Sequence, residues 1–323
     1  MPIMLDNLPF GFTNDGERAT LHVLKSPTVE VDVSDYGATV VGIRCLDKFS
    51  RMDDVISGFS GVHGYERHSK QIGSAVEHGC SEQNGRSSDN SIGKRIWKSE
   101  TNGTRSVTFK YVRRDDEDGQ TGNVNLFVKY KLQGSQLQVQ HMATTDRDTT
   151  INMTNKLYFN LSGHTLWGGD LKHHLVTLYS NSYIDSYGEA RSVENTVFDL
   201  RKPTFLSKDR IVGIQPAQEK PNGRSFCLSS SEHKKLVARI KHVSNGRIVT
   251  IETSQPFVSL DCASDFDLVE GKNEVKYNRH SCVAVTPQNH PPCSEKIDAP
   301  QRVNLKAGDS FGHSTWYSFS HTL

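Results

Sequence analysis

The residue types that most often carry enzyme chemistry are present in this chain, but they lack the spacings of familiar catalytic sites. Gly58-Phe59-Ser60-Gly61 places a serine near two glycines without the Gly-x-Ser-x-Gly spacing of a nucleophile elbow, so it predicts a turn. The acidic run 115–119 suggests calcium, yet the twelfth position of such a loop falls on Leu126, where an EF-hand needs a glutamate. The run therefore predicts a solvated hairpin tip.

The histidines and cysteines also argue against a bound metal. The 14 histidines include no His-x-x-x-His pair, and the 6 cysteines include no Cys-x-x-Cys pair. His173 and His174 are adjacent, so on a strand they would point to opposite faces and could not share an ion. We therefore expect no metal, no cofactor and reduced cysteines, as in a cytoplasmic protein; a nuclear location stays open.

Composition excludes several classes of function. The chain has 323 residues, with 38 Lys and Arg against 37 Asp and Glu, so its net charge is +1. A general nucleic-acid binder would show a basic excess, and a membrane span would need about 18 consecutive apolar residues, which the chain lacks. Residues 1–10 also lack the pattern of a secretory signal. We expect neither nucleic acid nor membrane as a partner.

Period-two alternation of apolar residues predicts strands throughout the chain. It is clear at residues 29–33, and two alternating segments at 126–132 and 137–141 flank Gln133-Gly134-Ser135, which predicts a hairpin. Ser244-Asn245-Gly246 predicts a second hairpin. No segment predicts a helix longer than two turns, and the polar stretch 77–94 predicts an exposed loop. The sequence thus predicts an all-β protein, a large antiparallel β-sandwich forming a single domain over residues 1–323.

Several segments, in one order along nearly the whole chain, carry a resemblance to a known family. They are Asp35–Val40, Asp53–Phe59, Gly64-Tyr65, Asn155–Leu161, Val197–Pro203, Gln255-Pro256, Gly271–Asn273, Gln288-Asn289, Leu305–Asp309 and Thr315–Tyr317. Together they resemble the aldose 1-epimerase (galactose mutarotase) family, whose signature Asn-His-Ser/Thr-Tyr-Phe-Asn-Leu is matched by Asn155–Leu161. The resemblance implies a galactose mutarotase-like supersandwich with a sugar cleft on a concave face.

The same resemblance implies a chemistry whose key residues have changed. Mutarotation needs a base for the proton of the anomeric hydroxyl and an acid that protonates the ring oxygen. The family's acid is the histidine of its signature, and Lys156 stands at that position; its base is a glutamate, and Asp309 stands there. Lysine, with a free pKa of about 10.4, is a poor acid at pH 7. An aspartate is one methylene shorter, and a misplacement of about 1 Å can cost roughly 100-fold in rate.

The positions that contact substrate in the family have changed as well. The family's Asp-His-Asn-Phe corresponds to Gly223–Phe226, so its aspartate is replaced and Arg224 stands beside the replacement. Its early Asn-Arg pair corresponds to Ser81-Glu82, which turns a cation into an anion. The segment that supplies a second histidine is absent. Gln288 is retained, and with Arg224 and Glu82 it forms our expected ligand-binding set.

We therefore favour a pseudoenzyme that keeps the sandwich and has lost the catalytic set. It would bind a carbohydrate in an altered cleft, an anionic small ligand through Lys156 and Arg224, or a protein partner. We also expect an ion pair between Lys156 and Asp309. The alternative is a diverged but active aldose 1-epimerase in which Asp309 is the base and His68, His78 or His164 supplies the acid. A third hypothesis is a pure protein-interaction module.

Overall fold

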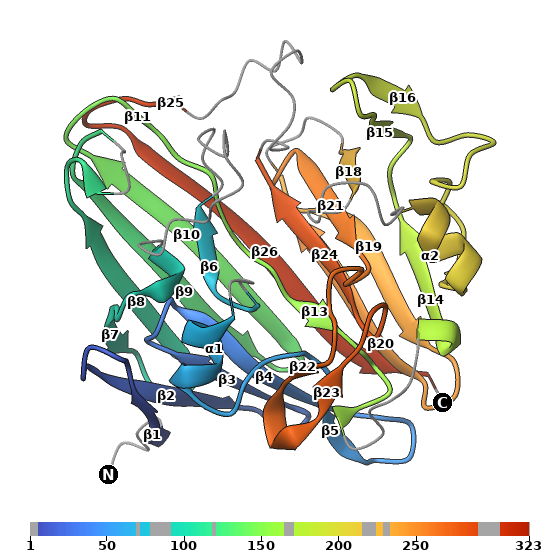
Figure 1. The fold of residues 1–323 in the computed structure, drawn as a ribbon, viewed down its shortest axis with the longest axis horizontal. Helices are drawn as coiled ribbons and strands as arrows, with labels where there is room; N and C mark the ends of the chain where they lie inside the picture. The colour runs from blue at the N-terminus through green and yellow to red at the C-terminus, as the bar shows by residue number, and fades with distance from the viewer. Residues whose placement is uncertain are drawn as a thin grey trace.

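Antiparallel strands make up nearly all of the regular structure in the computed structural model (Figure 1). The structure describes residues 6–68, 72–77, 92–117, 121–164, 171–214, 224–228, 233–289 and 304–322. Within these ranges the two α-helices, α1 (Val62–Arg67) and α2 (Lys208–Ile214), have 6 and 7 residues. The predicted all-β class is confirmed.

The largest sheet has nine strands and runs across the whole molecule (Figure 1). In spatial order its strands are β17 (Thr204–Phe205), β14 (His174–Leu178), β19 (Lys235–His242), β20 (Arg247–Thr253), β26 (Ser310–His321), β10 (Gln136–Thr145), β9 (Val124–Gln133), β8 (Ser106–Arg113) and β7 (Lys98–Thr101). In β9 the burial alternates residue by residue, so one face of this sheet packs inward and the other faces outward.

Two further sheets complete the sandwich. A six-stranded sheet has the order β13 (Tyr158–Phe159), β24 (Val283–Gln288), β21 (Phe257–Asp261), β18 (Arg224–Cys227), β15 (Ser182–Ile184) and β16 (Ala190–Ser192). A five-stranded meander contains β1 (Asp6–Phe12), β2 (Arg18–Lys25), β3 (Val29–Ser34), β4 (Thr39–Leu46) and β5 (Met52–Asp54). One apolar core joins all three sheets: Val128 of the nine-stranded sheet, Leu260 of the six-stranded sheet and Val31 of the meander belong to it.

Short strand pairs and single turns of 3₁₀-helix connect these sheets. The pairs are β6 (Ala75–Glu77) with β12 (Met153–Asn155), β11 (Thr149–Thr150) with β25 (Asn304–Leu305), and β22 (Val269–Glu270) with β23 (Lys276–Tyr277); the 3₁₀ turns are Ile92–Lys94, Leu171–His173 and Lys272–Glu274. Most of the polar stretch 77–94 lies outside the described residues. No helix among the described residues is long and apolar enough to cross a membrane.

Both predicted hairpins are confirmed. β9 and β10 pair in register from Val124↔Thr145 to Gln133↔Gln136 around Gly134, whose φ of 57° is left-handed. β19 and β20 pair around Asn245-Gly246, and Gly246 has a φ of 78°. Glycine adopts such angles without steric cost, which is why these short turns could be predicted from the sequence.

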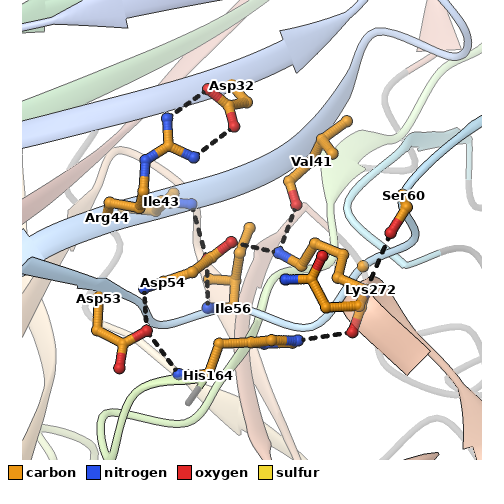
Figure 2. Close-up of polar contacts among 12 residues, drawn as sticks. Asp32, Val41, Ile43, Arg44, Asp53, Asp54, Ile56, Ser60, His164 and Lys272 are labelled. Atoms are coloured by element: carbon orange, nitrogen blue, oxygen red, sulfur yellow. Dashed lines mark hydrogen bonds and ion pairs between the residues drawn. The ribbon is translucent and has the colours of Figure 1, made fainter. Parts of the chain in front are cut away.

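A buried ion pair ties the meander to the loop between β22 and β23 (Figure 2). The Lys272 Nζ lies 2.6 Å from Asp54 Oδ2 and donates to the carbonyl oxygen of Val41 at 2.8 Å. The other oxygen of Asp54 accepts the backbone N–H groups of Ile43 and Ile56. The side chains of Lys272 and Asp54 are only 9% and 15% exposed, so each charge is stabilised chiefly by these partners.

We expect Lys272→Met to lower the free energy of unfolding by about 3–5 kcal/mol, because it leaves the Asp54 carboxylate buried without its cation. Urea denaturation followed by circular dichroism measures this. The matched control is Lys25→Met, which removes an exposed ion pair to Asp6 with side chains 52% and 58% exposed; it should leave the free energy of unfolding nearly unchanged. Equal effects of the two substitutions would contradict the bridge's structural role.

Candidate functional site

One face of the six-stranded sheet is polar, and it carries Gln288 of the expected ligand-binding set. Period-two alternation places Leu260 and Val285 in the core and turns their neighbours in the strand to the other face. That polar face presents two rows across the strands: Tyr158, Ala284 and Asp261 in the first, and Thr286, Ser259 and Ser225 in the second; Gln288 follows Thr286 on the same side of β24. These residues are called the polar face below.

Lys156, just before β13, forms an ion pair with Asp261 at the end of β21. The distance from Lys156 Nζ to Asp261 Oδ2 is 2.5 Å, and the Tyr158 hydroxyl donates to the same oxygen at 2.8 Å. The backbone N–H of Ala263 donates to the other oxygen. Asp261 has no exposed surface, whereas the Lys156 side chain remains 16% exposed. The carboxylate is thus fully buried, and three donors stabilise its charge.

The surroundings of Tyr158 reinforce this arrangement. Burial raises the pKa of its hydroxyl well above the usual range, and the neighbouring negative charge of Asp261 raises it further. Tyr158 therefore stays protonated and serves as a hydrogen-bond donor. The Lys156 ammonium also lies 5.1 Å from the centre of the Tyr158 ring, a favourable cation–π distance. Lys156, Asp261 and Tyr158 form one charge-balanced cluster.

The predicted ion pair between Lys156 and Asp309 is wrong. Asp309 lies between β25 and β26, where its backbone N–H bonds to the carbonyl of Lys306 in a turn, and it is exposed. The expectation assumed that the residues at the two catalytic positions would face each other. Instead the buried Asp261 takes the lysine, because a fully desolvated carboxylate needs a cation more than an exposed one does.

Gln288, a member of the expected ligand-binding set, lies on the polar face. It is 2% exposed, and its Nε2 donates to the Ser225 hydroxyl at 3.2 Å. Thr286 is 1% exposed, and its hydroxyl has no hydrogen-bond partner among the described residues. An amide and three hydroxyl groups on adjacent strands can both donate and accept, which suits the hydroxyl groups of an uncharged sugar.

Arg224 lies on the opposite face of the same sheet. It pairs in register with Leu260, a core residue, and its guanidinium lies over Phe198 at 4.9 Å and Tyr183 at 5.8 Å from the ring centres. Its neighbour Ser225 points to the polar face, because successive residues of a strand alternate. The structure thus separates Arg224 from Lys156 and does not assemble the expected cationic pair.

The structure describes only some of the remaining candidate residues. Glu82, Gly223 and His78 lie outside the described residues. His164 is buried, with its Nε2 bonded to the Lys272 carbonyl oxygen and its backbone N–H to Asp53 (Figure 2); burial lowers its pKa. His68 stacks on Phe59, with ring centres 4.8 Å apart.

Asp261 is the site residue that sequence reasoning missed. It lies five residues after Pro256, in the alternating pattern of β21 that also places Ser259 on the polar face. A carboxylate in register with a serine on a predicted strand was the available signal. The pattern indicates a polar face there, but only the folded chain shows which cation pairs with the acid.

Two stacked histidines support the polar face through Asn155, the neighbour of Lys156. The His141 Nε2 bonds to Asn155 Oδ1 at 2.7 Å, and the Asn155 amide donates to the Gly73 carbonyl at 2.8 Å. The rings of His141 and His313 lie 4.6 Å apart, and both are buried. Among the described residues, no group of three or more His, Cys, Asp or Glu could hold a metal ion.

A family model and several curated relatives match this chain. The aldose 1-epimerase family model matches residues 20–318. The chain is similar to galactose mutarotase from Homo sapiens, at 29% identity over 92% of this chain and 93% of the relative, and from Rattus norvegicus, at 30% identity over the same shares. An aldose 1-epimerase from Escherichia coli is 23% identical over 70% of this chain and 67% of its own length.

Solved structures share the fold. A GalM/aldose epimerase homologue from C. elegans superposes with a TM-score of 0.79 at 21% identity, covering 99% of this chain and 100% of that one. A galactose 1-epimerase from Lactobacillus acidophilus superposes with a TM-score of 0.77 at 17% identity and the same coverage. The expected sandwich architecture is confirmed.

We expect Lys156→Met and Asp261→Asn to be coupled. Lys156→Met alone leaves a buried carboxylate without its cation and should lower the free energy of unfolding by about 3–5 kcal/mol. In the double variant the anion is absent too, so most of this loss should be recovered. Chemical denaturation of the four proteins measures the coupling; additive effects would show that the pair contributes nothing to stability.

We expect the free energy of unfolding to decrease as the pH is lowered below about 6.5, because of His141. Burial lowers the pKa of His141 to about 4, whereas in the unfolded chain histidine titrates near ~6.5. Between these values the unfolded chain binds a proton that the folded chain does not, so the free energy of unfolding decreases by roughly 3 kcal/mol as the pH falls. In His141→Gln this part of the pH dependence should disappear, measured as melting temperature from pH 7.5 to 4; an unchanged slope would contradict the assignment.

Proposed function

Because the chain belongs to the aldose 1-epimerase family, we propose that it binds an uncharged aldose on the polar face without interconverting its anomers. The observation that carries the proposal is the 2.5 Å ion pair between Lys156 and the buried Asp261. It occupies the position at which the resemblance places the catalytic acid.

The residue at the position of the family's acid, Lys156, gives the first reason for this proposal. Protonation of the ring oxygen needs a group that gives up its proton readily near neutral pH. The Lys156 ammonium is the cation paired with a carboxylate that has no exposed surface, and giving up its proton would leave that buried anion without its partner. Tyr158 cannot substitute, since burial and Asp261 raise its pKa well above the usual range. His68 and His164 are engaged with Phe59 and Lys272.

The second support concerns the base. Asp309, at the position of the family's glutamate, is an exposed residue of the turn before β26. An exposed carboxylate is surrounded by water and is not held toward a substrate hydroxyl. Its side chain is also shorter than glutamate by one methylene. A general base must lie within hydrogen-bond reach of the anomeric hydroxyl, and the aspartate side chain reaches less far than the family's glutamate.

The third support concerns the ligand. Lys156 is neutralised by Asp261, and Arg224 points to the other face of the sheet, so the polar face has no surplus of positive charge among its described residues. Gln288, Ser225 and Thr286 instead offer neutral donors and acceptors. An uncharged sugar fits this set better than the anionic small ligand considered from the sequence.

We expect the protein to leave the mutarotation of α-D-galactose and α-D-glucose at the spontaneous rate. Polarimetry on freshly dissolved sugar, at high protein concentration and beside an active galactose mutarotase, measures this. A rate above the buffer blank that disappears in Asp309→Ala would establish the alternative, a diverged but active aldose 1-epimerase with Asp309 as base. Such a result would overturn the proposal.

Sugar binding is tested in the same preparation by isothermal titration calorimetry with D-galactose and D-glucose. Loss of one buried amide hydrogen bond costs about 1 kcal/mol, so Gln288→Ala should weaken binding by roughly fivefold. Gln133→Ala, at the exposed end of β9, is the matched control and should leave affinity unchanged. No heat with either sugar would favour the protein-interaction hypothesis instead.

A further inference from the structure

The outward face of the nine-stranded sheet carries far more positive than negative charge. Its strand residues include Lys98, Lys110, Lys129, Lys131, Arg239 and Lys241, against the two acidic residues Glu100 and Glu252. The chain as a whole is nearly balanced, with 38 basic and 37 acidic residues. Both acids are already paired, Glu100 with Lys110 at 2.6 Å and Glu252 with Lys234 at 3.0 Å. The remaining cations therefore have no ion-pair partner on this face within the part of the chain that the structure describes.

Four of these lysines lie together on β7, β8 and β9, and we call them the lysine cluster: Lys98, Lys110, Lys129 and Lys131. Lys98 lies directly opposite Lys110, an arrangement of like charges that destabilises a sheet. Lys129 and Lys131 are two residues apart on one side of β9, which separates them by roughly 7 Å. Within the described ranges, Lys98, Lys129 and Lys131 form no ion pair. The cluster resembles a binding surface for several anionic groups.

Neutral amides continue the same rows on β10. Gln140 pairs in register with Lys129 and with Ser314 of β26, and Gln138 pairs with Lys131 and with Trp316. These glutamines are partly exposed, as expected for side chains on an outward sheet face. Each row thus passes from an ammonium group to an amide and then to a hydroxyl or indole. Amides and hydroxyls donate to and accept from sugar hydroxyl groups.

We propose that this face binds an anionic polysaccharide, a polymer that carries sulfate or carboxylate groups on some sugar units and free hydroxyl groups on others. The polysaccharide would lie across the strands, with its anionic groups on the lysine cluster and its hydroxyl groups on Gln138 and Gln140. This surface is on the opposite side of the core from the polar face, so it is independent of the proposed function.

Three other anionic partners fit less well: duplex nucleic acid, single-stranded nucleic acid and an anionic membrane. A nine-stranded sheet is about 38 Å wide, too broad to enter a groove of duplex nucleic acid. Single-stranded nucleic acid needs uncovered aromatic rings for stacking, but Lys234 lies 4.9 Å over Trp316 and Lys110 lies 5.8 Å over Phe127. An anionic membrane also attracts lysines, but the large exposed apolar side chains described on this face, Val112, Phe205 and Leu236, lie on three non-adjacent strands and form no cluster that could insert.

Titration with heparin, a sulfated polysaccharide, at several salt concentrations tests the proposal. The full chain should bind, and Lys129→Glu/Lys131→Glu should weaken binding at least tenfold. Arg18→Glu/Lys276→Glu changes the net charge equally at exposed positions of β2 and β23 and should leave affinity within twofold. Gln138→Ala/Gln140→Ala should weaken binding about threefold without changing its salt dependence. Lys129→Gln/Lys131→Gln replaces the charge-reversed variant if circular dichroism shows that the latter is unfolded.

Three results would overturn the proposal. Equal losses in the lysine-cluster variant and the control variant would mean that heparin responds to overall charge alone. Tighter binding to poly(dT) or to phosphatidylserine vesicles at the same salt concentration would assign the face to nucleic acid or to a membrane. Absence of heparin binding by the unmodified protein at low salt would remove the surface from consideration.

Discussion

A carboxylate with no exposed surface determines the character of the polar face. Three donors surround Asp261 inside the protein: the Lys156 ammonium, the Tyr158 hydroxyl and the backbone N–H of Ala263. The lysine is therefore a structural requirement of Asp261 as much as a replacement for a catalytic acid. Changing either residue alone would leave a buried charge, which explains why the two belong together.

Asp54 and Lys272 form a second buried ion pair, but the surroundings of its ammonium group differ from those of Lys156. The Lys272 ammonium has two acceptors, Asp54 and the Val41 carbonyl, and it joins segments of the scaffold. The Lys156 ammonium has Asp261 as its only acceptor within the described ranges, and its side chain keeps 16% of its surface exposed. An ammonium group has three donors. Lys156 thus retains the capacity to donate to a ligand hydroxyl, which is consistent with a binding role.

Much of the fold was predictable from the sequence because its signals are local. Alternation in β9 and β10, with Gly134 between them, specifies a hairpin without reference to the rest of the chain. The site was predictable only in part. Gln288 lies on the polar face and Lys156 lies just before β13 beside it, whereas Asp261, the acid that binds Lys156, is 103 residues from Tyr158 and follows from no local pattern.

The expectations that Arg224 would lie beside Lys156 and that Asp309 would pair with Lys156 failed for one reason. Position in a family motif says which residue occupies a site, but not which way a substituted neighbour points. Arg224 falls one residue from Ser225, and strand alternation sends it to the other face of the sheet. Asp309 falls one residue before β26, so it stays in an exposed turn where water competes with any partner.

The scaffold and the polar face depend on different residues, so one can change without the other. The core that joins the three sheets and the Lys272 bridge lie apart from the polar face, so a lysine at position 156 costs the scaffold little once Asp261 neutralises it. The polar face presents neutral donors and acceptors, which suit the recognition of hydroxyl groups. The sandwich supplies the rigid support that such recognition requires.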